Sequence, residues 1–141
     1  MDLNLATKER CQLVDISADV RRAVRASGVR DGLCLVWCPH TTAGVTVNEN
    51  ADPDVPADLL MGLDRVVDAR WPFRHGEGNS DAHLKSTLVG CSATIAVRGG
   101  EVRLGTWQAV WFCEFDGPRT RRIEVTVISF NGENTKRAAA R

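Results

Sequence analysis

The sequence predicts an α+β fold, in which a single compact domain combines a mostly antiparallel or mixed β-sheet with two main helices. Two segments have the apolar spacing of amphipathic helices, one near 17–27 and one near 54–67. Seven or so short segments have the apolar pattern of strands, and several follow one another in the second half. Gly99-Gly100 lies between two of these segments and is typical of a tight hairpin. Helices set among such strands favour the α+β class.

The first segments read as two strands and a helix. Residues 2–7 are a weak strand candidate, and 11–16 are a better one. Ser17 or Asp19 can cap a helix that runs through about Ser27, where Gly28 stops it. The apolar stripe of this helix comprises Ile16, Val20 and Val24.

The next two segments are predicted strands of different kinds. Residues 32–38 form a continuous apolar run, which is the pattern of a central strand covered on both faces. Pro39 ends this run. Residues 42–48 alternate between apolar and polar positions, which indicates a second strand.

A longer helix is predicted after the second strand. Asp52 and Asp54 offer caps, and Pro53 and Pro56 suit a first turn. Residues 70–81 then read as a polar, glycine-containing loop, and residues 82–89 as a short helix. The apolar face of the longer helix comprises Leu59, Leu60, Leu63, Val66 and Val67.

The remainder reads as β structure that ends before the C-terminus. We expect a single domain over residues 1–130 and a frayed tail over 131–141, because that tail has no periodicity. The predicted strands of this part are 91–97, 101–105, 107–115 and 119–130.

The charge balance limits the partners of the protein. The chain has 141 residues, with 18 Lys plus Arg and 18 Asp plus Glu, so its formal net charge is zero. This argues against a protein that holds nucleic acid or a membrane surface by bulk charge. The run 32–38 is too short to cross a bilayer, and charged residues at 8–10 stand where a secretory signal needs apolar ones. We therefore expect a cytoplasmic protein.

The five cysteines are odd in number and include no C-x-x-C pair, so we expect free, mostly buried thiols in a reducing compartment. Cys38 differs from the others because it lies two residues before His40. The full set is Cys11, Cys34, Cys38, Cys91 and Cys113.

Two histidines bracket a short polar segment. Glu77 and Asp81 lie between His75 and His83, with glycines that let the backbone bend. Imidazole with carboxylate is a ligand set for Zn²⁺ and similar ions, and a loop that enters a helix can bring both rings to one ion. The alternative is a surface loop with two solvated histidines.

Three further residues are candidates for a polar site in the strands. Glu49 lies at the end of the strand after His40, too early to serve as a helix cap, and is a candidate base or ligand. Gln108 and Glu114 share one face of a strand with apolar residues and need polar partners. The alternatives are that they line a polar pocket, that they lie on a partly solvated face of the sheet, or that they form a subunit contact.

The only concentrated basic stretch follows a Gly-Pro pair. Arg119 and Arg121 alternate on a predicted strand, a geometry that suits a phosphate or carboxylate. Lys85 and Ser86, near the start of the short helix, can add donors for the same anion. The alternative is a charged edge strand that blocks aggregation.

Taken together, these pieces resemble the YjbQ-type family, described as secondary thiamine-phosphate synthases. The resemblance covers about residues 37–128. It implies a compact α+β fold, assembly as a homotrimer, and a polar cavity near subunit boundaries that binds metal. The matching motifs are His40-Thr41-Thr42-Ala43, Asn48-Glu49-Asn50, Asp52-Pro53, His75 through His83, Leu84-Lys85-Ser86, Gly90, Gly105-Thr106-Trp107-Gln108, Glu114 and Arg121-Arg122. The site residues that the resemblance implies are His40, Glu49, His75, Glu77, His83, Gln108 and Glu114.

From this resemblance we expect a metal-assisted enzyme that joins an aminopyrimidine-methyl diphosphate to a thiazole phosphate and releases diphosphate. The expected cofactor is Zn²⁺ or a similar divalent ion on His40, His75 and His83, with Mg²⁺ as the alternative. The expected partner is a small phosphorylated metabolite, and we expect no nucleic-acid or membrane partner. Glu49, Glu77, Gln108 and Glu114 are the expected catalytic residues; Lys85, Ser86, Arg119 and Arg121 are expected to bind phosphate. A hydrolase or lyase on such a metabolite and a non-catalytic module that binds it are the alternatives.

Overall fold

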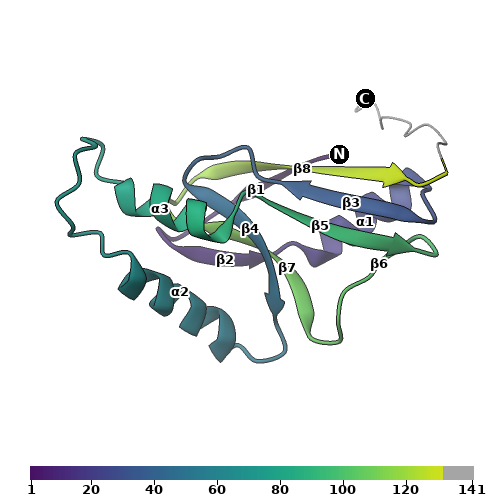
Figure 1. The fold of residues 1–141 in the computed structure, drawn as a ribbon, viewed down its shortest axis with the longest axis horizontal. Helices are drawn as coiled ribbons and strands as arrows, with labels where there is room; N and C mark the ends of the chain where they lie inside the picture. The colour runs from purple at the N-terminus through teal and green to yellow at the C-terminus, as the bar shows by residue number, and fades with distance from the viewer. Residues whose placement is uncertain (132–141) are drawn as a thin grey trace.

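The computed structural model describes residues 1–131, which form eight strands and three helices (Figure 1). Every strand pair is antiparallel, and the strands form two sheets. The predicted α+β class is therefore confirmed. In chain order the elements are β1 (Asp2–Ala6), β2 (Gln12–Asp15), α1 (Ser17–Ser27), β3 (Gly32–Trp37), β4 (Ala43–Glu49), α2 (Asp54–Val66), α3 (Ser80–Val89), β5 (Ser92–Arg98), β6 (Glu101–Val102), β7 (Gln108–Glu114) and β8 (Thr120–Ser129).

The core lies between the inner faces of the two sheets. One sheet has the strand order β1-β8-β3-β5-β6 and the other has the order β2-β7-β4. Apolar side chains of both sheets meet the stripe of α1 in one cluster, which includes Cys34, Val36, Val45, Phe112 and Val125. The period-two pattern of each strand therefore sends one set of side chains into this layer.

Helix α1 has the predicted length and stripe, but its N-terminus is capped differently. Ile16, Val20 and Val24 are buried, and Gly28 ends the helix with a φ of 71°. Ser17 is the first helical residue rather than the cap, because its hydroxyl accepts the Val110 N–H at 2.9 Å. The carboxylate of Asp15 instead accepts the Ser17 N–H at 2.8 Å.

Strand β3 is central in its sheet, as predicted, but only one of its faces is covered. Cys34 and Val36 are fully buried against the core, whereas Leu33 and Leu35 are half-buried and Trp37 is exposed. The prediction of cover on both faces is wrong within residues 1–131, because no other layer of this part of the chain packs on that side. We call this surface, made by Leu33, Leu35, Trp37 and Ile128, the outer sheet face.

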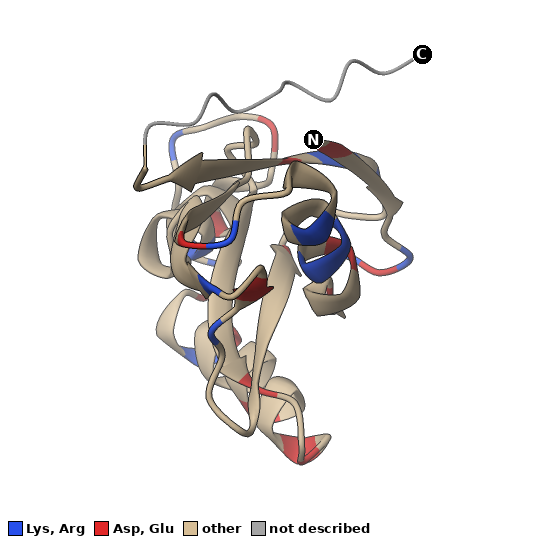
Figure 2. Ribbon diagram, turned by 90° about the vertical axis from the view of Figure 1, so that its right-hand side faces the viewer, with Lys and Arg blue, Asp and Glu red and all other residues tan. Residues whose placement is uncertain are grey.

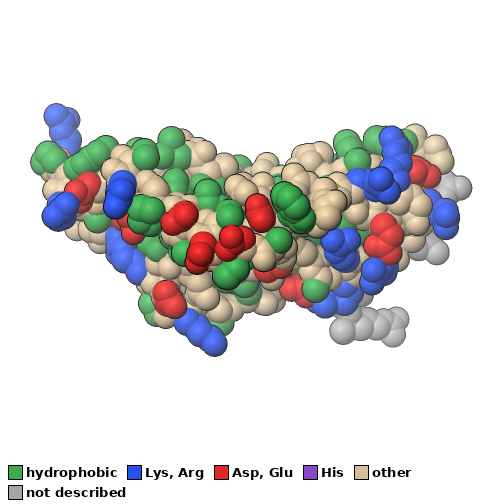
Figure 3. Space-filling view, turned by 90° about the horizontal axis from the view of Figure 1, so that it is seen from below, with side chains coloured by type: hydrophobic (Ala, Val, Ile, Leu, Met, Phe, Trp, Pro, Cys, Tyr) green, Lys and Arg blue, Asp and Glu red, His purple; other side chains and the backbone are tan. Residues whose placement is uncertain are grey.

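Helix α2 forms where predicted, although its apolar stripe does not enter the main core. The Asp52 carboxylate accepts the Asp54 N–H at 2.9 Å at its N-terminus, and the helix buries none of its residues. Leu60 and Leu63 pack against a small second cluster, while Val66 is exposed. Seen from below, the surface shows apolar side chains beside acidic ones and no histidine (Figure 3).

The second half differs from prediction mainly in where elements begin and end. Helix α3 begins at Ser80, inside the segment predicted as loop. Gly99 and Gly100 form the predicted turn, both with positive φ, but β6 has only two residues. Of the predicted tail 131–141, residues 132–141 lie outside the described residues.

No helix within residues 1–131 has the length and apolar character to cross a membrane.

The five cysteines are free, as predicted, and most of them are buried. Cys34, Cys38 and Cys113 are buried, but Cys91 is exposed, contrary to expectation. Burial raises the pKa of the Cys34 thiol to about 11. Basic and acidic residues are interspersed at the end of the molecule that carries α1 (Figure 2), where Arg25 pairs with Glu101 at 2.8 Å.

The close approach of β4 to α3 leads to a stability prediction. A Cβ atom on Gly44 would lie 2.6 Å from the Gly90 carbonyl oxygen, so Gly44→Ala must push β4 away from the end of α3. We expect a loss of about 2 kcal/mol in the free energy of unfolding, measured by urea denaturation. The control is Gly62→Ala on α2, where a Cβ meets nothing within 4 Å and helix propensity favours Ala. Equal stability of the two variants would contradict the steric argument.

Candidate functional site

Helix α3 positions the candidate site because it is fixed to the start of β4. The Ser86 hydroxyl donates to the Ala43 carbonyl at 2.7 Å, and the Val45 N–H donates to the Gly90 carbonyl at 3.0 Å. The Ser86 hydroxyl therefore has a structural contact, and its expected phosphate-binding role stays a prediction. These contacts fix the C-terminal half of α3 to the start of β4, and His83 and Lys85 lie just before them on the same helix.

Two of the three histidines meet at the N-terminal half of α3. The rings of His75 and His83 lie edge to face, with their centroids 5.5 Å apart and an interplanar angle of 80°. Glu77 Oε2 lies 3.5 Å from His75 Nε2. The two rings border a pocket of about 430 Å³ that is otherwise lined by Phe73, Ser80 and Leu84. We call it the histidine pocket.

His40 is not brought to this pair by contacts within the chain. Its Nε2 lies 3.0 Å from the Arg122 N–H, which donates to it, so the ring is held against β8. Burial, together with the positive charge of Arg121, lowers the pKa of His40, which favours the neutral ring. Within residues 1–131, no three His, Cys, Asp or Glu side chains are grouped to hold a metal ion. A single chain therefore offers two imidazoles to an ion rather than three.

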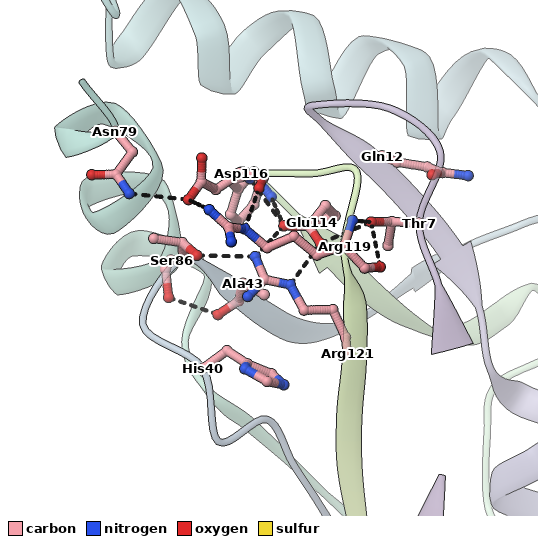
Figure 4. Close-up of polar contacts among 12 residues, drawn as sticks. Thr7, Gln12, His40, Ala43, Asn79, Ser86, Glu114, Asp116, Arg119 and Arg121 are labelled. Atoms are coloured by element: carbon pink, nitrogen blue, oxygen red, sulfur yellow. Dashed lines mark hydrogen bonds and ion pairs between the residues drawn. The ribbon is translucent and has the colours of Figure 1, made fainter. Parts of the chain in front are cut away.

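Glu114 and Arg121 form a buried ion pair (Figure 4). Glu114 is fully buried and Arg121 is nearly so. The Nε of Arg121 donates to Oε2 of Glu114 at 2.7 Å, and its Nη2 donates both to Oε1 and to the Thr42 hydroxyl. The Thr7 hydroxyl and the N–H groups of Phe115 and Asp116 also donate to the carboxylate. The carboxylate thus accepts five hydrogen bonds from the protein, and the guanidinium donates through its Nε and Nη2 atoms.

This pairing gives Glu114 and Arg121 a structural role, and their expected catalytic and phosphate-binding roles stay predictions. Burial alone would raise the pKa of Glu114, but hydrogen bonds from Arg121 and the Asp116 N–H outweigh it and lower the pKa. An ionised carboxylate with five donors is a poor general base, and the guanidinium already has its charge balanced by that carboxylate. The available sequence signal was the Gly-Pro turn between the two residues, which returns the chain toward the end of β7.

The other expected phosphate ligands also have protein partners. Lys85 is buried, and its Nζ lies 3.1 Å from Asp81 and 2.5 Å from Asp64. Burial lowers the pKa of Lys85, but hydrogen bonds to the two carboxylates outweigh it and raise the pKa. Arg119 is half-exposed and pairs with Asp116 at 2.8 Å. No common anion site of Lys85, Arg119 and Arg121 is evident from these pairings.

Glu49 and Gln108 face each other at the other end of β4. They are register partners in the β4–β7 pair, and β4 runs away from α3 toward them (Figure 1). The Gln108 Oε1 accepts the Gly105 N–H at 2.8 Å, so this side chain shapes the turn before β7. Within one chain, these two residues lie apart from the histidine pocket.

The sequence reasoning missed Asn79 and the apolar walls of the histidine pocket. Asn79 precedes α3 and is buried; its Nδ2 donates to Asp116 at 3.0 Å, and its Oδ1 has no partner within the described part of the chain. Phe73 and Leu84 give no motif because single apolar residues in a loop or on a short helix are common. Only their position beside the two imidazoles makes them informative.

The buried ion pair predicts a specific pH dependence of stability. Glu114→Gln leaves the Arg121 charge buried without its partner, so we expect a loss of about 3 kcal/mol in the free energy of unfolding. Because folding lowers the pKa of Glu114, its contribution is present above its unfolded pKa of about 4.3 and is lost as pH falls through the folded value. The difference between wild type and variant, measured by urea denaturation, must therefore shrink in acid. A constant difference over this range would contradict the assignment.

Comparisons with known proteins give one consistent result. A family model for UPF0047 proteins of the YjbQ-like kind matches residues 1–130. A UPF0047 protein of Methanocaldococcus jannaschii is 50% identical over 124 residues, which are 88% of this chain and 90% of that protein. The UPF0047 protein YugU of Bacillus subtilis is 48% identical over 127 residues, which are 89% of this chain and 96% of that protein.

Solved structures agree with the sequence comparison. A YjbQ/UPF0047 protein of Clostridium acetobutylicum has a TM-score of 0.89 and 49% identity, and the match covers 91% of this chain and 99% of that one. A YbjQ-like protein of unknown function from Sulfolobus solfataricus has a TM-score of 0.89 and 32% identity, over 92% of this chain and 95% of that one. The chain therefore belongs to the YjbQ-like UPF0047 family.

Proposed function

We propose that this protein is a small metal-assisted enzyme that acts on a phosphorylated metabolite at the histidine pocket. The observation that carries the proposal is the meeting of two imidazoles at the border of a pocket large enough for one small ring system. Imidazole nitrogens are preferred ligands of Zn²⁺ and similar ions. A bound ion of this kind supplies Lewis-acid stabilisation of negative charge on phosphate oxygens.

The donor set fits such an ion in part. His75 and His83 supply two imidazoles, and Glu77 is within reach of His75. Catalytic zinc sites use three protein ligands, so a further ligand is required from Glu77 or from a neighbouring subunit. Oxygen ligands would favour Mg²⁺, whereas the two imidazoles favour Zn²⁺.

We propose thiamine-phosphate synthase-type chemistry as the reaction. In this reaction a bond forms between the methylene carbon of the aminopyrimidine and the thiazole nitrogen. The carbon–oxygen bond to the diphosphate breaks, and the diphosphate leaves with the electron pair. Phe73 and Leu84 offer apolar surfaces for a flat ring, and the Ser80 hydroxyl offers a donor at the same pocket. The support for this reaction is family resemblance together with a pocket of suitable chemistry.

The residues of this chain have different parts in the proposal. His75 and His83 hold the ion, and Glu77 orients His75 through the contact at 3.5 Å. Glu49 and Gln108 act only if another subunit brings them to the pocket, because they lie apart from it within the chain. Glu114 is a positioning residue through its pair with Arg121.

The proposal predicts that metal content and turnover depend on the histidine pair. Protein purified without a His tag should hold about one Zn²⁺ or similar ion per site. His83→Ala should lose both this ion and the release of diphosphate from the two substrates, measured by elemental analysis and a diphosphate assay. Glu101→Gln, an exposed carboxylate on β6, is the control and should behave as wild type.

The outcomes separate the alternatives. Diphosphate release from the pyrimidine substrate without the thiazole partner would indicate a hydrolase or lyase. Tight binding of substrate with no turnover would indicate a binding module. Wild-type metal content in His83→Ala would overturn the metal proposal.

We also propose that the protein assembles as a homotrimer through the outer sheet face. Trp37 and Ile128 are 40% and 48% exposed, and they lie on one surface with the half-buried Leu33 and Leu35. A central strand with an apolar outer face gains stability when a second layer covers it. Closed cyclic assembly of identical chains supplies such a layer.

The trimer proposal predicts that Leu35→Glu dissociates the assembly, because a carboxylate cannot be buried there without a partner. Light scattering coupled to size exclusion would measure a mass near that of one chain, 15.4 kDa. Met61→Glu on α2 is the matched control, since Met61 is 43% exposed but lies away from the outer sheet face. Retention of the trimer by Leu35→Glu, or its loss in Met61→Glu as well, would contradict this interface.

A further inference from the structure

A second pocket, of about 320 Å³, lies on a different face of α3 from the histidine pocket and shares no lining residue with it. It opens between α3, the segment after α2 and the loop that joins β1 to β2. We call it the Lys85 pocket. Its charged or polar lining residues are Arg10, Cys11, Asp64, Asp68, Arg70, Asp81 and Lys85.

Without Asp64, the three groups that meet at Asp81 in this pocket, buried Lys85, buried Asp81 and half-exposed Arg10, carry a net positive charge. Lys85 and Asp81 are each 2% exposed, and the ammonium donates to Asp81 at 3.1 Å. Arg10 donates from Nη2 to the other oxygen of Asp81 at 2.7 Å. Lys85, Arg10 and Asp81 therefore sum to one positive charge. At the rim, Asp68 and Arg70 neutralise each other.

Asp64 supplies the balancing negative charge, and it is the exchangeable member of the cluster. Its side chain is 59% exposed, although its partner Lys85 is buried. It lies on α2, which buries none of its residues. When Asp64 turns into water, its own carboxylate is solvated and the buried ammonium keeps Asp81 as a partner at 3.1 Å, so the buried charge is not left unpaired. That movement leaves an ammonium N–H directed at an open pocket.

We propose that the Lys85 pocket binds the phosphate group of a small phosphorylated ligand, and that Asp64 occupies the place of that group in the free protein. A phosphate brings more negative charge than a carboxylate and accepts hydrogen bonds from ammonium and guanidinium donors together. Arg10 is half-exposed and uses only Nη2 toward Asp81, so its other N–H groups are open to the ligand. Burial raises the pKa of Cys11, and the neutral thiol does not repel an anion.

This inference does not rest on the proposed function, because the two pockets are lined by different residues. It predicts that an internal carboxylate competes with phosphate. We expect Asp64→Asn to bind inorganic phosphate about fivefold more tightly than wild type. Arg10→Gln should bind at least tenfold more weakly, since a charge-assisted donor is lost. Titrations followed by amide and side-chain NMR shifts near neutral pH and at constant ionic strength measure both effects.

Matched variants make the result decisive. Asp58→Asn makes the same charge change on the same helix, and Asp58 has no ion-pair partner within residues 1–131, so it should leave phosphate affinity within about twofold of wild type. Acetate should bind more weakly than phosphate to both wild type and Asp64→Asn, because it brings less negative charge and fewer acceptor oxygens. Equal effects of Asp64→Asn and Asp58→Asn, or unchanged binding in Arg10→Gln, would overturn the proposal. Retained phosphate binding in His83→Ala would show that this site is independent of the histidine pocket. Circular dichroism confirms that each variant is folded.

Discussion

The ion pair between Glu114 and Arg121 is the contact on which the arrangement of the two sheets depends. Glu114 ends β7 in the three-stranded sheet, and Arg121 begins β8 in the five-stranded sheet. Thr7 and Thr42, which follow β1 and precede β4, complete the cluster. Burying two charges is costly, and the cost is offset here because the carboxylate accepts five hydrogen bonds. A cluster with such narrow geometric demands favours one arrangement of four strand ends over others.

The same cluster explains why α3 presents two unlike surfaces. Ala43, next to Thr42, accepts the hydrogen bond of Ser86, so the position of α3 follows from that of the buried pair. The buried residues of α3 include Asp81, Lys85 and Ser86 beside Ala82, so polar contacts rather than an apolar stripe hold the helix. One face is therefore free to carry His83 with apolar neighbours, and another carries Lys85 among carboxylates.

The sequence predicted those features whose cause is local. The stripe of α1, the alternation of β4 and the Gly99-Gly100 turn each depend on residues within a few positions. The short spacing between His75 and His83 likewise predicted that the two rings lie close together, as they do in the structure. Periodicity gives the direction of an apolar face but not what covers it, so the apolar face of α2 was predicted without its position outside the main core. The partners of Glu114 include Thr7, which is 107 positions away, and no spacing rule predicts such a pair.

A charged residue in a sequence indicates what chemistry is possible, but not whether the protein has already used that charge internally. In a chain with equal numbers of acidic and basic residues, every arginine can be neutralised by another side chain. Arg121 is neutralised by Glu114, which is fully buried and cannot leave without breaking the fold. Lys85 is neutralised in part by Asp64, which is mostly exposed and can leave while Asp81 stays paired with the ammonium. The exposure of the partner, rather than the identity of the basic residue, therefore distinguishes a structural charge from one that is available to a ligand.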